Sequence, residues 1–474
     1  MNSVLFNSYT FWAFFAVVML LYRCLPHQWQ NRMLLAASYV FYGWWNWRFL
    51  SLILIVTILN YCTALGVVST DDKRRRKLLV GLSVAVNLGM LGVFKYFSFF
   101  AAELVNLLGA IGLSVSLPSL QIVLPVGISF YTFQAMSYTI DVYRRHTQPT
   151  RNLRDFALYV AFFPQLVAGP IERSSRLLPQ VVNPRHRRYD DFADGLFLVL
   201  IGLFKKIVIA DNLALIVNGI FAEDIADLSG PDCLVGVYAF AFQIYGDFSG
   251  YSTIARGLAK WMGFDLMTNF RMPYLARTPN DFWRRWHVSL STWLRDYLYI
   301  PLGGNRGGTW RTCRNLMLTM LLGGLWHGAG WTFVTWGLFH GLILVAYRML
   351  TRRRTSDPAG GSRLKSILSI AVMFHLACLG WLFFRAQSMM QAWSMLTRMF
   401  TNFVPSVFTT YCFTSILFYA GPLMLFEFWL DRKDDPMRLT KVHWGYRAAA
   451  YSYAAIMIIL FRPMMPSEFI YFQF

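Results

Sequence analysis

Charged residues are scarce in this sequence of 474 residues. Asp, Glu, Lys and Arg make up 14% of the chain and hydrophobic residues 56%, whereas soluble domains average about 25% charged and roughly 45–50% apolar residues. Acidic residues are rarer than basic ones. The chain has 24 Asp and Glu and 44 Lys and Arg, which gives a net charge of +20. This balance excludes a protein folded around one soluble core.

Cysteine pairs are also absent. The six cysteines are scattered singly, without a C-x-x-C pair, at Cys24, Cys62, Cys233, Cys313, Cys378 and Cys412. The sequence therefore predicts neither a disulfide framework nor a structural zinc site, and we expect the cysteines to be small buried apolar residues. No metal site and no permanently bound cofactor are predicted.

The signature motifs of several enzyme classes are missing. The sequence contains no H-E-x-x-H, no G-x-S-x-G, no G-x-x-x-x-G-K-[ST] and no G-x-G-x-x-G. A metalloprotease, a serine hydrolase with its own triad and a P-loop ATPase are therefore unsupported. Paired halves with interrupted helices, which would indicate an inverted-repeat transporter, are not found either.

Long apolar blocks are what the sequence does contain. Each is about 20 residues long, enough at about 1.5 Å per residue to cross a hydrocarbon layer of ~30 Å. Open strand edges cannot be satisfied in lipid and the alternation of a membrane barrel is absent, so the blocks are predicted to be helices. The fold class is therefore an all-α polytopic membrane protein, whose first apolar segment we expect to be retained. The predicted spans are 5–24, 34–46, 49–68, 78–99, 121–142, 193–217, 233–250, 314–329, 332–350, 366–385, 409–430 and 445–463.

Basic residues gather in a few loops between these spans. They occur at 73–77, at 144–188, around Arg352–Arg354 and at 432–441, whereas 207–255 has no Lys or Arg. By the positive-inside rule the basic loops face the cytosol, and the connectors 106–119, 218–232 and 386–408 face the outer side. The positive charge then reflects topology and attraction for anionic lipids or substrates, and nucleic acid is not an expected partner.

Two segments do not fit a simple crossing. The stretch 156–171 is apolar but contains Pro164 and Pro170 between basic flanks, and 268–314 mixes Trp and Tyr with Arg and His. We expect both to be interfacial or re-entrant, because irregular backbone at membrane depth is tolerated only where it is buried in protein or lines a wet cavity.

His327 is the most informative ionisable residue. It lies at membrane depth within 323–331, a stretch with four glycines and two tryptophans. Ionisable residues in such positions usually face the interior of the bundle and mark a functional path. Neutral imidazole also suits general-base chemistry. The alternative is a packed histidine that bonds a neighbouring carbonyl.

The other histidines are weaker candidates. His287 follows Arg284 and Arg285 and is either a catalytic or orienting residue or part of an interfacial helix with snorkelling arginines. His340 approaches His327 only if the glycines at 328 and 330 form a turn, and a structural role is favoured for it. His375 is expected to be a core histidine.

The sequence around these histidines resembles the membrane-bound O-acyltransferase (MBOAT) family, in its bacterial alginate O-acetylase branch. Similar stretches cover nearly the whole chain. They are 5–9, 124–134, 164–171, 202–206, 247–252, 282–287, 297–306 and the closing 469–474.

The resemblance implies a bundle of about 10–12 transmembrane helices, with re-entrant or interfacial helices, around a tunnel that crosses the bilayer. One integral-membrane domain would span 1–474, with N-terminal helices at 1–120, a catalytic core at 121–350 and C-terminal helices at 351–474. The family's most characteristic histidine falls on His327 and a second functional histidine on His287. The expected substrate- or donor-binding residues are Arg284, Arg285, Arg295, Trp326 and Asn305.

The implied function is that of an O-acetyltransferase in the bacterial inner membrane. It would take acetyl groups from a cytosolic donor, acetyl-CoA, for O-acetylation of an exported polysaccharide such as alginate or cellulose, with His327 as base. Periplasmic acetyl-handling proteins or SGNH-type acetyltransferases, the polysaccharide and membrane lipid are the expected partners. D-alanyl transfer to teichoic acid and peptidoglycan O-acetylation are alternatives, and a polysaccharide exporter or channel is the non-enzyme alternative.

Overall fold

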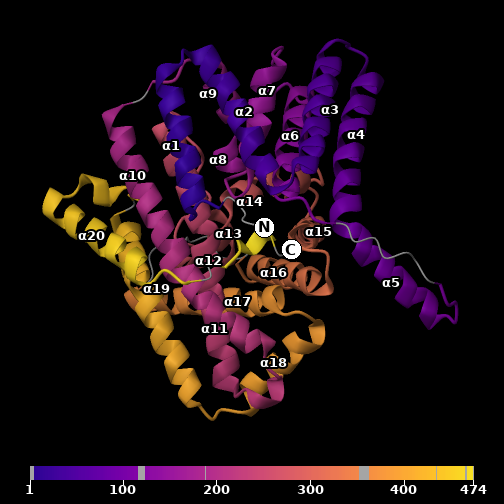
Figure 1. Cartoon of the computed structure of the whole chain (residues 1–474). Coiled ribbons are helices and arrows are strands. Elements are labelled where there is room, and N and C mark those ends of the chain that lie inside the picture. The colour runs from indigo at the N-terminus through magenta and orange to yellow at the C-terminus, as the bar shows by residue number, and fades with distance from the viewer. Residues whose placement is uncertain are drawn as a thin grey trace. The chain divides into compact units, whose positions relative to one another are not determined.

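A computed structural model describes residues 5–115, 123–186, 188–351, 362–433, 435–464 and 467–472 (Figure 1). Every regular element in these ranges is helical, with no strand among them. The prediction of an all-α protein is confirmed. The basic run Arg352–Arg354 and the first two residues of the predicted span 121–142 lie outside the described ranges.

Five helical stretches in the described part of the chain are long and apolar enough to cross a membrane. They are His27–Val68, Lys73–Ala110, Trp331–Thr351, Arg363–Arg385 and Val407–Lys433. The remaining predicted spans are helical over most of their described residues. Their helices are shorter or interrupted or, as with α12 (Gly230–Trp261) and α15 (Thr309–His327), long but less apolar. The span 193–217, for example, is divided by a π-helical segment, η3 (Phe204–Ala210).

The chain divides into two compact units, and the first contains residues 1–195 and 255–267. Its helices are α1 (Tyr9–Cys24), α2 (His27–Asn46), α3 (Leu50–Val68), α4 (Lys73–Leu91), α5 (Phe97–Ala110), α6 (Ile128–Tyr143), α7 (Leu153–Ala161), α8 (Phe163–Leu166) and α9 (Ser174–Val182). Helices α3, α4 and α6 pack together. The Asn60 side-chain oxygen accepts hydrogen bonds from Ser83 Oγ (2.7 Å) and Thr139 Oγ1 (2.9 Å), and such polar contacts hold helices together where lipid supplies no hydrophobic driving force.

The second unit contains residues 196–254 and 268–474. Helix α10 (Tyr189–Leu203) begins in the first unit, and helix α12 (Gly230–Trp261) ends in it. The other helices are α11 (Asp211–Ala222), α13 (Pro279–Arg285), α14 (Val288–Leu294), α15 (Thr309–His327), α16 (Trp331–Thr351), α17 (Arg363–Arg385), α18 (Met389–Thr401), α19 (Val407–Lys433) and α20 (Trp444–Leu460). The functional subdivision at residues 120 and 350 stays a prediction.

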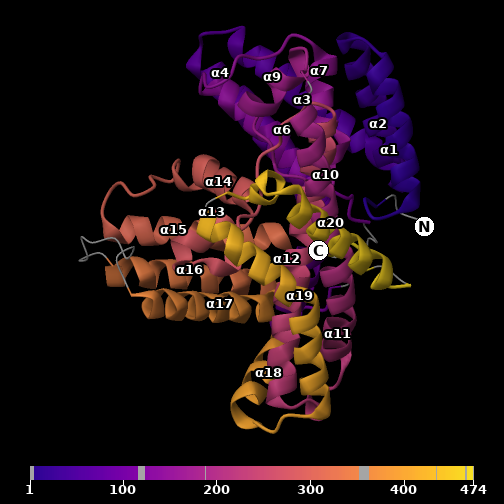
Figure 2. The ribbon, with the colours of Figure 1, turned by 90° about the vertical axis from the view of Figure 1, so that its left-hand side faces the viewer.

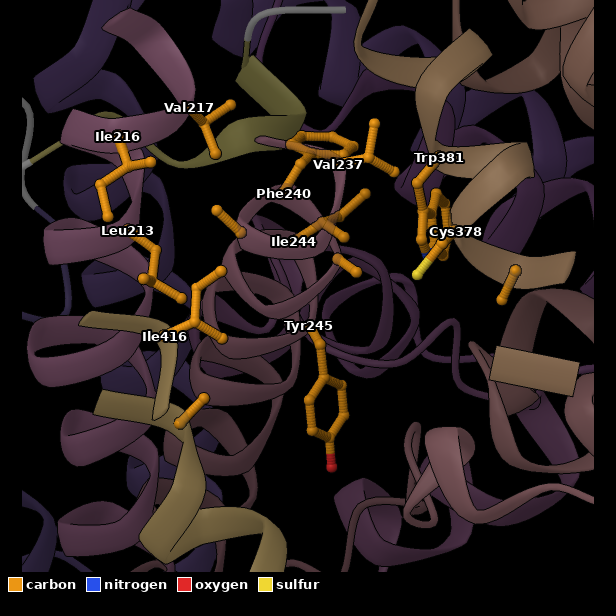
Figure 3. Packing of buried hydrophobic residues seen from close by; sticks show 14 of the residues in the cluster. Leu213, Ile216, Val217, Val237, Phe240, Ile244, Tyr245, Cys378, Trp381 and Ile416 are labelled. Carbon is orange, nitrogen blue, oxygen red and sulfur yellow. The ribbon is translucent and has the colours of Figure 1, made fainter. Parts of the chain in front are cut away.

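The core of the second unit is formed by α11, α12, α17 and α19. Figure 3 shows Phe240 and Ile244 of α12 between Leu213 of α11 and Trp381 of α17. These four side chains are no more than 1% exposed, and burying a large apolar side chain contributes about 1.5–3 kcal/mol. The core therefore fixes the helices that carry the polar residues described below.

Helices α15, α16 and α17 lie side by side (Figure 2). Close approach of α15 and α16 requires glycine on both, because a Cβ atom on Gly324 would meet Phe333 O at 2.3 Å and one on Gly337 would meet Met320 O at 2.4 Å. Between the two helices the chain turns at residues 328–330. The turn predicted from Gly328 and Gly330 is confirmed.

The two segments expected to be irregular consist of short helices. α7 and α8 are nine and four residues long, and α13 and α14 have seven residues each. The connector 386–408 is not the simple loop expected, since α18 occupies most of it. Ser388 caps this helix by accepting a hydrogen bond from Gln391 N (3.1 Å), and Gln391 Oε1 accepts one from Gln387 N (2.8 Å). This arrangement resembles a capping box, whose S-x-x-Q signal is present in the sequence.

The cysteine prediction is confirmed for four of the six residues. Cys233, Cys313, Cys378 and Cys412 are buried, but Cys24 and Cys62 are exposed on the surface of the helices. Helices that face lipid are expected to expose apolar residues. The apolar character of a cysteine therefore does not predict its burial in a membrane protein.

Candidate active site

His327 is the last residue of α15, at the point where the chain turns toward α16. Its side chain is buried, and its Nδ1 lies 3.3 Å from the Tyr471 hydroxyl. The rings of Trp326, Trp336 and Phe384 lie 4.9–5.3 Å from the imidazole. The site around His327 is thus an aromatic enclosure with one hydroxyl group directed at the imidazole.

His287 lies at the N-cap of α14 in the left-handed backbone region, with φ of 43°. This conformation costs roughly 1–2 kcal/mol for an L-residue other than glycine, and Asn269 helps to hold it. The Asn269 side-chain oxygen lies 3.1 Å from His287 Nδ1 and accepts hydrogen bonds from the backbone N (3.2 Å) and the hydroxyl (3.0 Å) of Ser289.

This arrangement assigns the tautomer of His287. An amide oxygen only accepts hydrogen bonds, so Nδ1 carries the proton and Nε2 carries the lone pair. Burial lowers the pKa of His287 to about 3. His287 is therefore neutral near pH 7, with an acceptor at Nε2.

Trp326 and Tyr471 contact both histidines. The Trp326 ring lies 5.9 Å from His287 and 5.0 Å from His327, and the Tyr471 ring lies 6.4 Å and 5.8 Å from them. Three of the predicted site residues, His287, Trp326 and His327, are thus brought together. Tyr471 completes the cluster, and we call these four residues the histidine cluster.

Three charged residues hold the segment that carries Tyr471. Lys206 Nζ lies 2.6 Å from Asp211 Oδ1 and 2.9 Å from Asp247 Oδ1. Lys206 also donates to the Ser467 carbonyl (3.0 Å), and Asp247 Oδ2 accepts a hydrogen bond from Ile470 N (2.7 Å). These residues, which we call the ion cluster, anchor 467–470 and so place Tyr471 beside His327.

The ion cluster depends on a close approach of α12 to the end of α10 and the π-helical segment η3 that follows it. A Cβ atom on Gly246 would lie 2.8 Å from Lys205 O, and one on Gly250 would lie 2.8 Å from Gly202 O. Glycine at 246 and 250 therefore lets the two helices approach until Lys206 reaches Asp247. π-Helical segments often occur at functional sites.

The remaining predicted binding residues have other surroundings. Arg284 is exposed. Arg285 pairs with Asp281 (2.8 Å) and Asp431 (2.7 Å), and Arg295 pairs with Asp296 (2.7 Å). Asn305 accepts a hydrogen bond from the Tyr299 hydroxyl (2.6 Å). Arg284 is therefore the predicted cation most available to a ligand.

The other two histidines of interest have structural surroundings. His340 is buried, and the Trp336 ring lies 4.8 Å from His340 and 4.9 Å from His327. His375 is exposed and not a core residue, and it hydrogen-bonds the Ala371 carbonyl (2.7 Å) and the Tyr238 hydroxyl (2.8 Å). Among the described residues, no three or more His, Cys, Asp or Glu side chains gather as metal ligands would.

Sequence reasoning did not assign roles to Tyr471, Asn269 or Lys206. Tyr471 and Lys206 lie in the stretches 469–474 and 202–206 that carry the family resemblance, which is the only local signal for them, and Asn269 lies in none of these stretches. Their partners are far away in the sequence, because 144 residues separate Tyr471 from His327 and 261 separate Lys206 from Ser467.

A family model described as "MBOAT, membrane-bound O-acyltransferase family" matches residues 39–390. The chain belongs to the membrane-bound O-acyltransferase family. The matched range includes both histidines and Trp326, whereas Tyr471 lies beyond it. This MBOAT protein is an O-acyltransferase, and with its five long apolar helical stretches it is a multi-pass membrane protein.

The curated relatives are named for acyl transfer to alginate, peptidoglycan and teichoic acid. The chain is 45% identical to the probable alginate O-acetylase AlgI of Azotobacter vinelandii over 84% of this chain and 78% of that protein. It is 37% identical to the peptidoglycan O-acetyltransferase of Helicobacter pylori over 84% of this chain and 80% of that protein. It is 26% identical to the teichoic acid D-alanyltransferase of Bacillus subtilis over 55% of this chain and 68% of that protein.

Proposed function

We propose that this MBOAT enzyme transfers acetyl groups from cytosolic acetyl-CoA through a membrane tunnel for O-acetylation of an exported polysaccharide such as alginate or cellulose. The observation that carries the proposal is the buried histidine cluster, in which His327 meets a hydroxyl group at Nδ1. The 45% identity to a probable alginate O-acetylase supports the choice of acyl group and acceptor.

In the proposed reaction His327 is the general base. Its Nδ1–H donates to the Tyr471 oxygen, and its Nε2 removes the proton from the acceptor hydroxyl. The hydroxyl oxygen attacks the thioester carbonyl, the C–S bond breaks as the tetrahedral intermediate collapses, and His327 returns the proton to the departing CoA sulfur. Backbone N–H groups of the 328–330 turn would stabilise the oxyanion.

His287 has a different role in this scheme. Because it is neutral with a lone pair at Nε2, it accepts a hydrogen bond and holds a reacting hydroxyl, and it does not supply a proton. Arg284, as the exposed cation of α13, would bind the phosphates of CoA. Arg285 would hold α13 in place through its two carboxylates.

The acceptor lies on the outer side in this proposal. Transfer would occur in the bacterial inner membrane, to the glycan directly or to a serine of a periplasmic or SGNH-type acetyltransferase partner. Peptidoglycan O-acetylation is the second candidate, and the 37% identity over 84% of the chain favours it. D-alanyl transfer has weaker support, from a match of 26% identity over 55% of the chain.

The test uses the purified full chain with radiolabelled acetyl-CoA, candidate glycans and candidate partners. The wild type should transfer label to one of them, and His327→Ala should lose about 10²–10⁴-fold in rate. His340→Ala is the matched control, because His340 is also buried but its ring contacts Phe282, Trp283 and Trp336 and no member of the histidine cluster. A folded His327→Ala variant that still acetylates at the wild-type rate would overturn the assignment of the base. Transfer of D-alanine from a carrier protein, without any transfer from acetyl-CoA, would overturn the donor.

A further inference from the structure

The first unit contains a polar pocket that the proposed reaction does not use. Its volume is about 270 Å³, and it lies where the segment between α3 and α4 meets the end of α6. A single water needs only about 10–15 Å³, so the pocket has room for a larger polar group. The polar residues that line it are Thr70, Asp71, Arg76, Arg145, Thr147 and Gln148. They lie in or beside the basic loops predicted to face the cytosol.

Arg76 has an unused donor at this pocket. Its Nη2 donates to the Tyr143 carbonyl (2.9 Å), and its guanidinium lies 5.3 Å from the centre of the Tyr143 ring. Its Nε is buried and has no hydrogen-bond partner within the protein. A buried donor without a partner is costly, so a rotation of the Arg76 side chain that brings this donor to a ligand oxygen in the pocket would relieve the cost.

Arg145 is held in a conformation that arginine rarely adopts. Its φ is 62°, at the C-terminal end of α6. Its N–H donates to Val142 O (3.1 Å) and the next N–H donates to Asp141 O (2.9 Å). Helices usually place glycine at such a left-handed terminus, so arginine is a conformational cost at this position. Strain of this kind often marks a functional site, and here the strained residue lines the pocket.

We infer that this pocket binds a phosphate group, carried either by a soluble molecule or by a lipid headgroup. Guanidinium groups match the geometry of phosphate oxygens, and Arg76 and Arg145 would provide them, with the hydroxyls of Thr70 and Thr147 as further donors. Asp71 is the one carboxylate among the lining residues. It would accept a hydrogen bond from a protonated phosphate oxygen, so the pocket should prefer phosphate, which keeps a proton near neutral pH, to sulfate, which does not.

The test measures the thermal unfolding of the full chain in detergent while inorganic phosphate or sulfate is titrated at constant ionic strength. Phosphate should raise the midpoint of the wild type saturably, and sulfate should not. Arg76→Gln and Arg145→Gly should each weaken phosphate binding by about tenfold or more, and Asp71→Asn should reduce the preference for phosphate. Arg75→Gln is the matched control, because Arg75 is exposed in the same basic run and does not line the pocket.

Arg145→Gly also tests whether misfolding explains a loss of phosphate binding. Glycine accepts a positive φ without strain, so the ligand-free variant should be at least as stable as the wild type while it binds phosphate less tightly. If Arg75→Gln loses as much affinity as Arg76→Gln, binding depends on the general positive charge and the assigned site is wrong.

Two further probes identify the source of the phosphate group. Coenzyme A is titrated against lipid-free protein, and native mass spectrometry compares phosphatidic acid with phosphatidylcholine retained from nanodiscs. Saturable coenzyme A binding that Arg76→Gln weakens assigns a soluble ligand, and selective retention of phosphatidic acid that Arg76→Gln abolishes assigns a lipid. If Arg76→Gln changes the binding of none of the three probes, inorganic phosphate, coenzyme A and phosphatidic acid, the inference is overturned. Coenzyme A binding that Arg76→Gln leaves unchanged remains compatible with the proposed reaction, so failure of this inference is distinguishable from failure of the proposed function.

Discussion

The ion cluster and the histidine cluster are both buried in the second unit, but they differ in charge. Lys206, Asp211 and Asp247 are no more than 2% exposed and stand in direct ion pairs. The histidine cluster contains a neutral imidazole at His287 and surrounding aromatic rings. Charge inside a membrane protein is tolerated when it is paired. The comparison teaches that the paired charges anchor the backbone, whereas the histidine cluster combines a neutral imidazole at His287 with aromatic rings.

We expect the largest effect on stability from Lys206→Met, which removes the cation of the ion cluster. It leaves Asp211 and Asp247 as buried carboxylates without their cation, and loss of one partner of a buried pair typically costs about 3–5 kcal/mol of stability. Thermal unfolding in detergent measures the loss. Acyl transfer should fall as well, because residues 467–470 lose their anchor and Tyr471 moves away from His327.

A triple variant provides the control for this prediction. Lys206→Met combined with Asp211→Asn and Asp247→Asn removes all three charges but keeps an amide oxygen at position 247 for Ile470 N. It should recover most of the stability. If Lys206→Met alone is as stable as the wild type, the ion cluster does not anchor the segment.

The second prediction concerns the pH dependence of stability. The folded-state pKa of His287 is lowered to about 3 by burial, below the value of about 6.5 for an unfolded histidine. The neutral form is therefore favoured by folding, and its stabilisation is complete above pH 6.5 and is lost as the pH falls from 6.5 toward 3. The slope should be about 1.4 kcal/mol per pH unit.

His287→Asn is the matched variant for the pH experiment. Asparagine tolerates a positive φ better than most residues, and it does not titrate. Unfolding midpoints between pH 4 and 8 should fall less steeply for the variant than for the wild type. Parallel curves would show that other groups cause the acid sensitivity.

Sequence patterns predicted the helices and part of the candidate site, because these features depend on residues that are close together in the sequence. The glycines at 328 and 330 indicated the turn after His327, and apolar blocks indicated the membrane helices. Local patterns do not reveal contacts such as Tyr471–His327 or Lys206–Ser467, which depend on packing across the whole second unit. The ion pair of Arg285 with Asp281 could have been predicted from the sequence, because residues four apart share one face of a helix. The contact of Arg285 with Asp431 could not, because no local pattern links the two residues.

Tyr471→Phe should have a smaller effect than the loss of His327 itself. It removes the hydroxyl that lies 3.3 Å from His327 Nδ1 and keeps the ring that contacts both histidines. A lost hydrogen bond of this kind costs about 0.5–1.5 kcal/mol, so the rate constant should fall by about 2- to 13-fold. Single-turnover acetyl transfer measures the rate constant, and the control is thermal unfolding, whose free energy should fall by no more than about 1.5 kcal/mol. A rate equal to that of the wild type would show that the hydroxyl does not orient the base.

We expect the smallest effects from substitutions of Arg284 and Arg285. These two variants compare a charge that would bind the donor with a charge that would hold α13 in place. Arg284→Gln changes an exposed side chain, so stability should change by no more than about 0.5 kcal/mol, while the KM for acetyl-CoA should rise severalfold. Arg285→Gln removes two partly exposed ion pairs, each worth about 0.2–1 kcal/mol, and should lower the unfolding midpoint with little change in KM. Steady-state kinetics and thermal unfolding of both variants distinguish the roles. If the KM follows Arg285 and not Arg284, the paired arginine and not the exposed one meets the phosphates.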